Sequence, residues 1–463
     1  MATPQAATIV ARLDRLPSAP YLWRLVALLS IGGFFEIYDL ILTGYVTPGL
    51  VRSGIFSANE KGLFGLTDQA GFASVTFAGL FLGTIALAFI ADRFGRRSIF
   101  TFALVWYAIA TAIMAAQETR FGVFFWRFIA GVGVGVELVT IDSYLGELVP
   151  KQLRGRAFAI NQAIQFTAVP IAAFLAWQLV PLDPFGIAGW RWVVVVPVLG
   201  AIVVWWVRLG LPESPRWLAD HGRFAEAEAV MARIEAQVGA SAGPTVEPTT
   251  PASVMAPAPD NAGFSEMWRA PYVQRVSMLA IFNVFQTIGF YGFGNWVPQL
   301  LASQGASFTK SLEYSFIIAI AFPLGPLVCS VFADRIERKW QICVAALGTA
   351  AFGLLFAKQS TALGLIVFGV LITTTNNLLS YAYHAYQAEL FPTRIRARAV
   401  GFVYSFSRLS TVFTSFMIAF FLQNLGATGV FVFIAFAMLV VILAIGVFGP
   451  KTNNRPLEEI STV

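Results

Sequence analysis

The sequence predicts an all-α membrane protein in which twelve transmembrane helices form two six-helix halves, with both termini in the cytoplasm. Hydrophobic residues make up 57% of the chain and charged residues 12%, whereas soluble domains carry about 25% charged residues. Apolar runs of about 20 residues recur, and each can cross a hydrocarbon core about 30 Å thick. Charged motifs at the ends of these runs also occur twice, at one constant spacing. A polytopic bundle of duplicated halves accounts for all three observations.

The repeated motifs define the two halves. Residues 144–156 contain a Tyr-x-x-Glu-x-x-Pro motif followed by Arg-Gly-Arg, and residues 386–398 contain the same motif followed by Arg-Ala-Arg, 242 positions later. The Asp-Arg cluster at 92–97 returns at 334–339 with the same offset. One offset shared by two separate motifs indicates an internal duplication rather than a coincidence.

Hydropathy places the spans and the segments between them. The chain divides into an N-terminal segment (1–21), a first bundle (22–210), a loop (211–271), a second bundle (272–448) and a tail (449–463). We expect the first six spans at 22–50, 69–91, 98–117, 121–148, 157–180 and 190–210. We expect the second six at 272–302, 312–333, 340–358, 362–389, 399–423 and 427–448.

The basic residues set the orientation and exclude several classes of protein. Most of the 31 Lys and Arg residues fall in alternate loops, which are therefore predicted to be cytoplasmic. The net charge of +6 is then a signal of topology, and we expect no nucleic-acid partner. The two cysteines, Cys329 and Cys343, fall in predicted spans and imply no disulfide framework. No GxxxxGK[ST] phosphate-binding motif occurs, so ATP-driven pumping is not expected.

The loop between the halves is predicted to be soluble. Residues 219–238 have apolar positions at helical spacing and should form an amphipathic helix. Residues 239–263 are rich in Pro, Ala and Thr and should form a flexible linker.

Four motifs together resemble the major facilitator superfamily, and within it the sugar-porter branch and its relatives that carry organic acids and other metabolites. They are DRFGRR at 92–97, the charged exit at 147–154, PESPRWL at 212–218 and GPKTNNRPLEEI at 449–460. The resemblance covers nearly the whole chain and implies the major facilitator fold and transport of a small molecule with protons. Two features depart from the sugar porters: their closing PET is Pro450-Lys451-Thr452 here, and their paired glutamines in span seven are only partly matched by Gln286. Both departures weaken the case for a sugar substrate.

Span one carries the candidate proton-coupling residues Glu36 and Asp39. With Thr43 and Thr47 they are spaced 3, 4 and 4, which places them on one helical face. A charged carboxylate inside a membrane costs at least a few kcal/mol, so it should face a cavity or a partner. In proton-coupled sugar porters the YD of span one pairs with the arginine before the GxGxG glycines, and Asp39 and Arg127 match those positions. We therefore predict proton coupling by Asp39, Glu36 and Arg127, with a permanently paired structural carboxylate as the alternative.

Glu137 is a candidate substrate residue. It follows Arg127 by ten residues in span four, which is about 15 Å along a helix. That depth is near the bilayer centre, where substrate sites of transporters lie. The alternative is a structural pair with another helix.

Other polar residues in the spans could line a cavity, or could only connect helices. An arginine in an apolar helix favours an anion, and its guanidinium group matches a carboxylate. In organic-anion branches of the resembled superfamily an arginine of span eleven contacts the substrate, and Arg408 occupies that span. The rival interpretation pairs Arg408 with Glu137 or another buried acid. The remaining candidates are Gln162, Gln165, Gln286, Tyr291, Asn295, Trp296, Asn377, Tyr381 and His384.

The charged loop residues are predicted to form a cytoplasmic gate that closes when the protein opens outward. A role in topology and helix capping alone is the alternative. The predicted gate residues are Asp92, Arg96, Arg97, Glu147, Arg154, Glu213 and Arg216 in the first half, and Asp334, Arg338, Glu389 and Arg396 in the second.

We expect a secondary active transporter, not an enzyme, that moves a small organic anion such as an aromatic or sugar-derived acid by proton symport and alternating access. Its partners would be the substrate, protons and the lipid bilayer, with no cofactor and no metal. We expect a monomeric multi-pass protein of the bacterial inner membrane. The alternatives are a neutral-sugar symporter or facilitator, an organic-cation transporter, and a non-transporting sensor.

Overall fold

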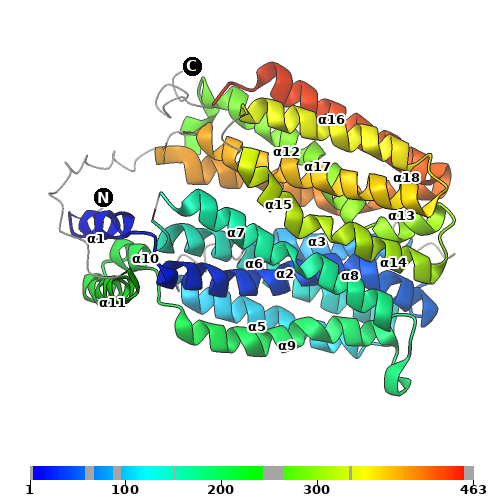
Figure 1. Cartoon of the computed structure of the whole chain (residues 1–463), viewed down its shortest axis with the longest axis horizontal. Coiled ribbons are helices and arrows are strands. Elements are labelled where there is room, and N and C mark those ends of the chain that lie inside the picture. The colour runs from blue at the N-terminus through cyan, green and yellow to red at the C-terminus, as the bar shows by residue number, and fades with distance from the viewer. Residues whose placement is uncertain are drawn as a thin grey trace.

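The computed structural model describes residues 4–57, 67–86, 95–150, 152–242, 264–332, 336–391 and 393–452, and every regular element within them is helical. The long helices run along one common direction and form two groups, one from each half of the chain (Figure 1). Three shorter helices, α1, α10 and α11, gather at one end of the molecule.

The described residues of the first half form six long rods built from seven α-helices, because the fifth rod is interrupted at Thr167. Close packing of the second and fourth rods depends on glycine. A Cβ atom on Gly131 would lie 2.5 Å from the carbonyl oxygen of Thr76, and one on Gly135 would lie 2.3 Å from that of Leu80. The helices are α2 (Pro20–Arg52), α3 (Asp68–Ala86), α5 (Arg96–Ala115), α6 (Arg120–Leu148), α7 (Arg154–Phe166), α8 (Ala168–Leu179) and α9 (Gly189–Gly210), with the 3-10 helix η2 (Pro184–Gly186) before α9.

The second half repeats this arrangement. Its last two predicted spans form one element, α18, which is broken at Gly426, where φ is 64°; this left-handed conformation favours glycine. The helices are α12 (Tyr272–Gly294), α13 (Val297–Ser303), α14 (Phe308–Ala319), α15 (Ala321–Phe332), α16 (Arg338–Phe356), α17 (Ala362–Glu389) and α18 (Thr393–Phe448), preceded by the 3-10 helix η3 (Phe264–Trp268).

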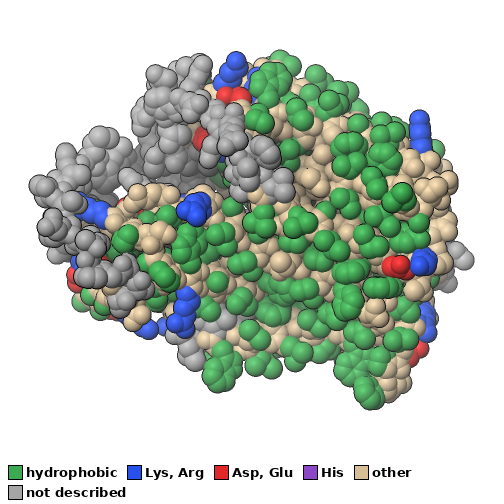
Figure 2. Space-filling view, viewed as in Figure 1, with side chains coloured by type: hydrophobic (Ala, Val, Ile, Leu, Met, Phe, Trp, Pro, Cys, Tyr) green, Lys and Arg blue, Asp and Glu red, His purple; other side chains and the backbone are tan. Residues whose placement is uncertain are grey.

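The surface of the bundle is apolar. Large side chains such as Trp206 (70% exposed), Val447 (66%) and Val344 (64%) point outward, and Figure 2 shows hydrophobic side chains spread over the long face, with Lys and Arg toward its two ends. Among the described residues, seven helical segments are long and apolar enough to cross a membrane. Such a surface requires lipid around it, so the chain is a multi-pass membrane protein. The count of twelve crossings stays a prediction.

A small helical unit caps one end of the first half. α1 (Pro4–Asp14) and α11 (Phe224–Ala242) pack together through Leu13, Met231 and Ile234, which are all 0% exposed. α10 (Pro215–Asp220) lies beside them. The amphipathic helix predicted at 219–238 corresponds to α11, whereas the helix in the N-terminal segment was not anticipated. The rest of the predicted linker, 243–263, lies outside the described residues.

We call the end that carries α1, α10, α11, Arg154 and Arg338 the basic end; it is the end predicted to be cytoplasmic. The other end of the bundle is the opposite end.

Candidate functional site

A cavity of about 840 Å³ lies between the two halves. Its wall comes from α2 and α7 of the first half and from α12, α17 and α18 of the second, and it reaches Gln152, Arg156 and Arg338 at the basic end. At the opposite end the halves meet: Gln299 donates a hydrogen bond to the carbonyl of Gly44 (3.1 Å), and the rings of Trp177 and Phe316 stack at 5.8 Å. The cavity therefore extends toward the basic end.

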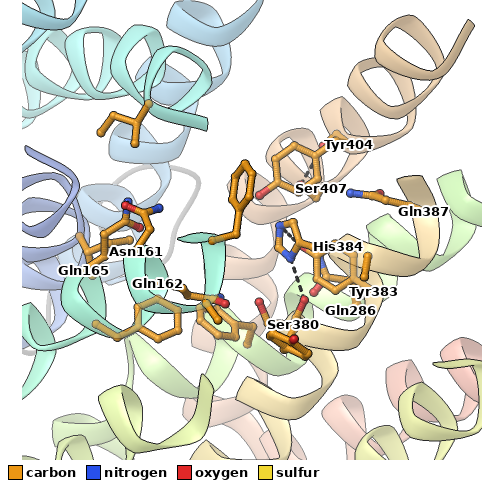
Figure 3. Close-up of a pocket in the computed structure, with 18 of the residues that line it drawn as sticks. Asn161, Gln162, Gln165, Gln286, Ser380, Tyr383, His384, Gln387, Tyr404 and Ser407 are labelled. Carbon is orange, nitrogen blue, oxygen red and sulfur yellow. Dashed lines mark hydrogen bonds between the residues drawn. The ribbon is translucent and has the colours of Figure 1, made fainter. Parts of the chain in front are cut away.

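Seven of the predicted substrate residues line this cavity. They come from α7, α12, α17 and α18, which converge on it from both halves (Figure 3). They are Gln162, Gln165, Gln286, Tyr291, Tyr381, His384 and Arg408.

Arg408 supplies the cavity with a buried positive charge. It is 2% exposed, and its guanidinium donates hydrogen bonds to the hydroxyls of Tyr291 (3.1 Å) and Tyr404 (2.8 Å). Its Nε has no hydrogen-bond partner, and no carboxylate of the described chain lies within 4.0 Å of it. The suggested pair between Arg408 and Glu137 is thus not formed. The two tyrosines hold the guanidinium in place without neutralising it.

His384 lies beside this charge in a fixed orientation. Its Nδ1 is 2.7 Å from the backbone carbonyl of Ser380, and its Nε2 is 3.1 Å from the hydroxyl of Tyr383 (Figure 3). Because a carbonyl oxygen only accepts, Nδ1 carries the proton, and the neutral ring can accept from Tyr383 at Nε2. The rings of Tyr383 and Tyr404 flank the imidazole at 4.1 and 5.8 Å. This corner of the cavity is therefore aromatic and rigid.

Amide side chains from both halves also line the cavity. Asn161 Oδ1 accepts from Ser30 (2.9 Å) and from Gln165 (3.2 Å), so its position is set by neighbouring side chains. The amides of Gln162 and Gln286 have no hydrogen-bond partner in the described part of the chain. Both line the cavity, so they can bind polar groups of a substrate.

Four predicted substrate residues do not line the cavity. Asn377 donates to the carbonyls of Ala321 (3.4 Å) and Phe322 (3.2 Å) and so connects α17 with α15. Asn295 and Trp296 lie at the junction of α12 and α13 and are 3% and 2% exposed. Glu137 is 0% exposed inside the first half.

The lining residues that were not predicted include Ser380, Tyr404 and Ser407. Tyr404 stands one helical turn before Arg408, so the i, i+4 spacing was the signal that could have identified it.

The predicted contact between Asp39 and Arg127 exists. Both side chains are 0% exposed, and Arg127 Nη1 lies 2.8 Å from Asp39 Oδ2. Arg127 also donates to Thr76 (2.9 Å) and Thr43 (3.0 Å), while Thr111 donates to Asp39 Oδ1 (3.2 Å). Every polar group of this pair is satisfied, and the pair stands behind the cavity wall. Glu36 is the one of the three predicted proton residues that lines the cavity.

The predicted gate residues form several contacts at the basic end. Arg338 pairs with Glu389 at 3.0 Å in the second half. In the first half Glu213 accepts from the backbone N–H of Arg97 (3.3 Å). Glu147 lies at the end of α6, next to these loops.

Arg154 and Arg216 converge on an unpredicted partner. Both lie near the Asp14 carboxylate, at 3.9 and 2.7 Å. Asp92 and Asp334, and the side chains of Arg96 and Arg396, lie outside the described residues.

The duplicated motifs form matching contacts. Tyr144 donates to the carbonyl of Pro212, and its repeat Tyr386 donates to the carbonyl of Pro450 (2.8 Å). The backbone N–H of Thr452 donates to Glu337 (2.9 Å). Glu337 thus supplies a carboxylate beside the closing segment, where the sugar-porter PET would have carried its own.

Known proteins with similar sequences are transporters. The family described as sugar (and other) transporters matches residues 25–463. YyaJ of Bacillus subtilis, which carries the provisional name of a metabolite transport protein, is 32% identical over 96% of both chains. The niacin transporter NiaP of Acinetobacter baylyi is 26% identical over 98% of this chain and 99% of its own.

The fold is also similar to that of a solved transporter. The xylose transporter XylE of E. coli, in a partially occluded inward-open conformation, superposes with a TM-score of 0.73 at 18% identity, covering 94% of this chain and 99% of XylE. Such proteins move metabolites and are not enzymes. The chain belongs to the sugar (and other) transporter family of the major facilitator superfamily.

Proposed function

We propose that this protein imports a small organic anion, an aromatic or sugar-derived carboxylate, together with protons. The two six-helix bundles would expose the central cavity alternately to the two sides of a bacterial inner membrane, and the transporter would work as a monomer. The observation that carries the proposal is the unneutralised guanidinium of Arg408 in the cavity wall.

A buried arginine without a counter-charge is costly. Removing an ion from water costs several kcal/mol even after the protein has relaxed, and neutral hydrogen-bond partners compensate only in part. The hydroxyls of Tyr291 and Tyr404 are such neutral partners. A carboxylate that accepts from the guanidinium would supply the missing charge, and substrate binding would then be selective for anions.

The walls of the site fit a flat or hydroxylated acid. Tyr383, His384 and Tyr404 offer ring faces next to Arg408. Gln162 and Gln286 offer amides to ring nitrogens or hydroxyls. The niacin transporter among the relatives is named for an aromatic carboxylate of this kind.

Proton coupling is supported by the Asp39–Arg127 pair. A carboxylate and a guanidinium that are both fully buried can separate only if the carboxylate takes up a proton or gains another partner. Movement of α2 relative to α6 would thus be linked to protonation of Asp39. Glu36 lines the cavity and stands three residues before Asp39 in α2, between this pair and the cavity.

A neutral sugar is the second candidate, because the family description includes sugars and the cavity carries the amides of Gln162 and Gln286. A sugar would leave Arg408 without a counter-charge. An organic cation could be balanced by Glu36, but it would be repelled by Arg408. Both alternatives therefore predict that loss of the Arg408 charge leaves binding unchanged or strengthens it.

Thermal-shift measurements on the purified full chain separate these candidates. The probes are acids with their neutral counterparts: nicotinate with nicotinamide, benzoate with benzamide, and gluconate with glucose. We expect an acid, and not its counterpart, to raise the Tm of the wild type. Arg408→Gln should weaken that binding by about 30-fold or more, since truncating one partner of a buried charge pair costs at least about 2 kcal/mol.

Arg191→Gln is the matched control, because Arg191 lies on α9, away from the cavity, and donates to the carbonyl of Ala115. It should bind the acid like the wild type. Binding of a neutral counterpart alone, or unchanged binding of the acid by Arg408→Gln, would refute the organic-anion assignment.

A further inference from the structure

Glu137 places a carboxyl group in the interior of the first half without a partner. Its side chain is 0% exposed. Neither Oε1 nor Oε2 has a hydrogen-bond partner among the described residues, and no Lys or Arg nitrogen there lies within 4.0 Å. Asp39, in the same bundle, has both an arginine and a threonine on its carboxylate.

The surroundings of Glu137 offer little to an ionised carboxylate. A Cβ atom on Gly32 would lie 3.5 Å from Glu137 Oε1 and 2.4 Å from the ring of Phe100. The carboxyl group therefore sits against the backbone of α2, beside an aromatic ring. The hydroxyl of Tyr107 in α5 is also buried, and no described residue forms a hydrogen bond with it.

The ionisable side chains near Glu137 are acidic or phenolic rather than basic. From α2 the acidic groups that act on it are Glu36 and Asp39, and from α5 the titratable group is Tyr107. α3 approaches the same stretch of α6 with backbone, at the contact between Leu80 and Gly135. Arg127 is ten residues away, about 15 Å along the helix, and all its nitrogens are engaged by Thr43, Thr76 and Asp39.

Glu137 must therefore hold a proton in this conformation. A carboxylate buried without a hydrogen bond or a cation is strongly destabilised, and acidic neighbours add to the cost. Asp39 is in the reverse situation, because Arg127 and Thr111 donate hydrogen bonds to its carboxylate.

α2 provides the geometry for this proton to move. Gly32, against which Glu137 lies, stands one helical turn before Glu36, and Asp39 follows three residues later on the same face. Glu36 lines the cavity that reaches the basic end. The three acids thus follow one another along α2: Asp39 at its pair with Arg127, then Glu36 at the cavity, then Glu137 beside Gly32.

We infer that Glu137 is a second proton-binding site of the transporter, which holds the transported proton in this conformation and releases it through Glu36 to the cavity. In the release step the Glu137 carboxyl loses its proton to the Glu36 carboxylate, and Glu36 then loses it to water in the cavity. Ionised Glu137 is stable only where water or a cation reaches it, so its affinity for a proton depends on the conformation of the bundle. This inference rests on the proposed proton symport, and it replaces the earlier expectation that Glu137 contacts substrate.

Infrared spectroscopy tests the protonation directly. The full chain in lipid nanodiscs should show the carbonyl stretch of a protonated carboxyl group near neutral pH, and titration of the wild type to moderately alkaline pH should leave the band in place. Glu137→Gln should lose it. Glu313→Gln is the matched control, since Glu313 pairs with Lys310 and is partly exposed, and it should keep the band. A wild type without the band, or a Glu137→Gln protein that retains it in full, would overturn the inference.

A transport measurement tests whether the proton is carried. With nicotinate, benzoate and gluconate as probes in proteoliposomes, the wild type should accumulate an acid when the outside is acidified. Glu137→Gln should lose this accumulation and keep exchange of internal for external acid. Accumulation at the wild-type level by Glu137→Gln would refute a proton-carrying role while the proposed symport stands. If the wild type moves no protons with any acid, the proposed symport fails, and the infrared band still reports separately on the protonation of Glu137.

Discussion

Replacing Arg127 by glutamine is expected to destabilise the first half strongly. The change removes the donors to Thr43, Thr76, the Asp39 carboxylate oxygen Oδ2 and the Asp39 backbone carbonyl. It leaves the Asp39 carboxylate 0% exposed, with Thr111 as its remaining hydrogen-bond donor. Breaking a buried pair from one side in this way costs about 3–5 kcal/mol, which corresponds to a fall in Tm of about 6 °C or more.

A double substitution should recover part of this loss. Asp39→Asn together with Arg127→Gln leaves two neutral amides in place of two charges, so no uncompensated charge stays buried. The double variant should therefore unfold at a higher temperature than Arg127→Gln alone. Such a rescue reports the interaction between the two side chains rather than the sum of two separate defects.

Thermal unfolding of the purified full chain, followed by tryptophan fluorescence, provides the measurement. Arg223→Gln serves as the control, because Arg223, just before α11, forms an exposed pair with Glu226, and such exposed pairs contribute little to stability. The reasoning would be refuted if Arg127→Gln unfolded at the same temperature as Arg223→Gln. It would also be refuted if adding Asp39→Asn lowered the Tm further.

Two further predictions concern the ends of the bundle. A Cβ atom on Gly44 would lie 2.3 Å from the carbonyl oxygen of Asn295, so Gly44→Val should prevent the opposite end from closing. A cysteine introduced as Gln299→Cys should then react with a water-soluble maleimide severalfold faster than the same cysteine in the protein that keeps Gly44. An unchanged rate would contradict the prediction. Asp14→Asn removes the carboxylate that contacts Arg216 at 2.7 Å; because the pair is partly exposed we expect a loss of about 1 kcal/mol or less, seen as faster proteolysis of α1, whereas unchanged proteolysis would show that the ion pair does not hold this helix.

The sequence predicted the ionic contacts better than the polar ones. Asp39 and Arg127 are charged residues in apolar spans, and in such surroundings a charge has few partners to choose from. Arg338 and Glu389 were marked in the same way by the repeat of the charged motifs. In each case the structure contains the expected type of contact.

The cavity wall could be predicted only in part, because a polar side chain in a span has two ways to satisfy its hydrogen bonds. Asn377 and Gln286 have similar chemistry, yet Asn377 binds backbone carbonyls of α15 while Gln286 faces the cavity. Helical periodicity gives the face of each residue, but not whether a neighbouring helix or open space lies opposite. That depends on the packing of the two halves, which hydropathy does not encode.

The helix α1 was missed for another reason. Ile9, Leu13 and Leu16 follow a helical spacing, and all three are buried, but the segment is short and was assigned by its place before the first span. Arg12, which contacts Glu228 and Glu235 of α11 at 2.5 Å, was counted only as a topology signal. Contacts between segments more than 200 positions apart cannot be derived from local pattern alone.

The residues proposed to bind the proton and the arginine proposed to bind the anion lie in different halves, and the contacts of α3 join them. At the repeat offset Asp39 and Arg127 correspond to Ile281 and Gly369, so an equivalent ionic pair cannot form in the second half.

In α3, Thr76 accepts from Arg127 (2.9 Å). The adjacent Phe77 packs edge to face on Tyr291 at 4.9 Å, and Tyr291 accepts from Arg408. Separation of Asp39 from Arg127 would therefore act on the helix that also contacts Tyr291, the hydrogen-bond partner of Arg408. An anion on Arg408 acts on the same helix from the other side, so the two sites can influence each other through α3 without a direct contact between proton and substrate.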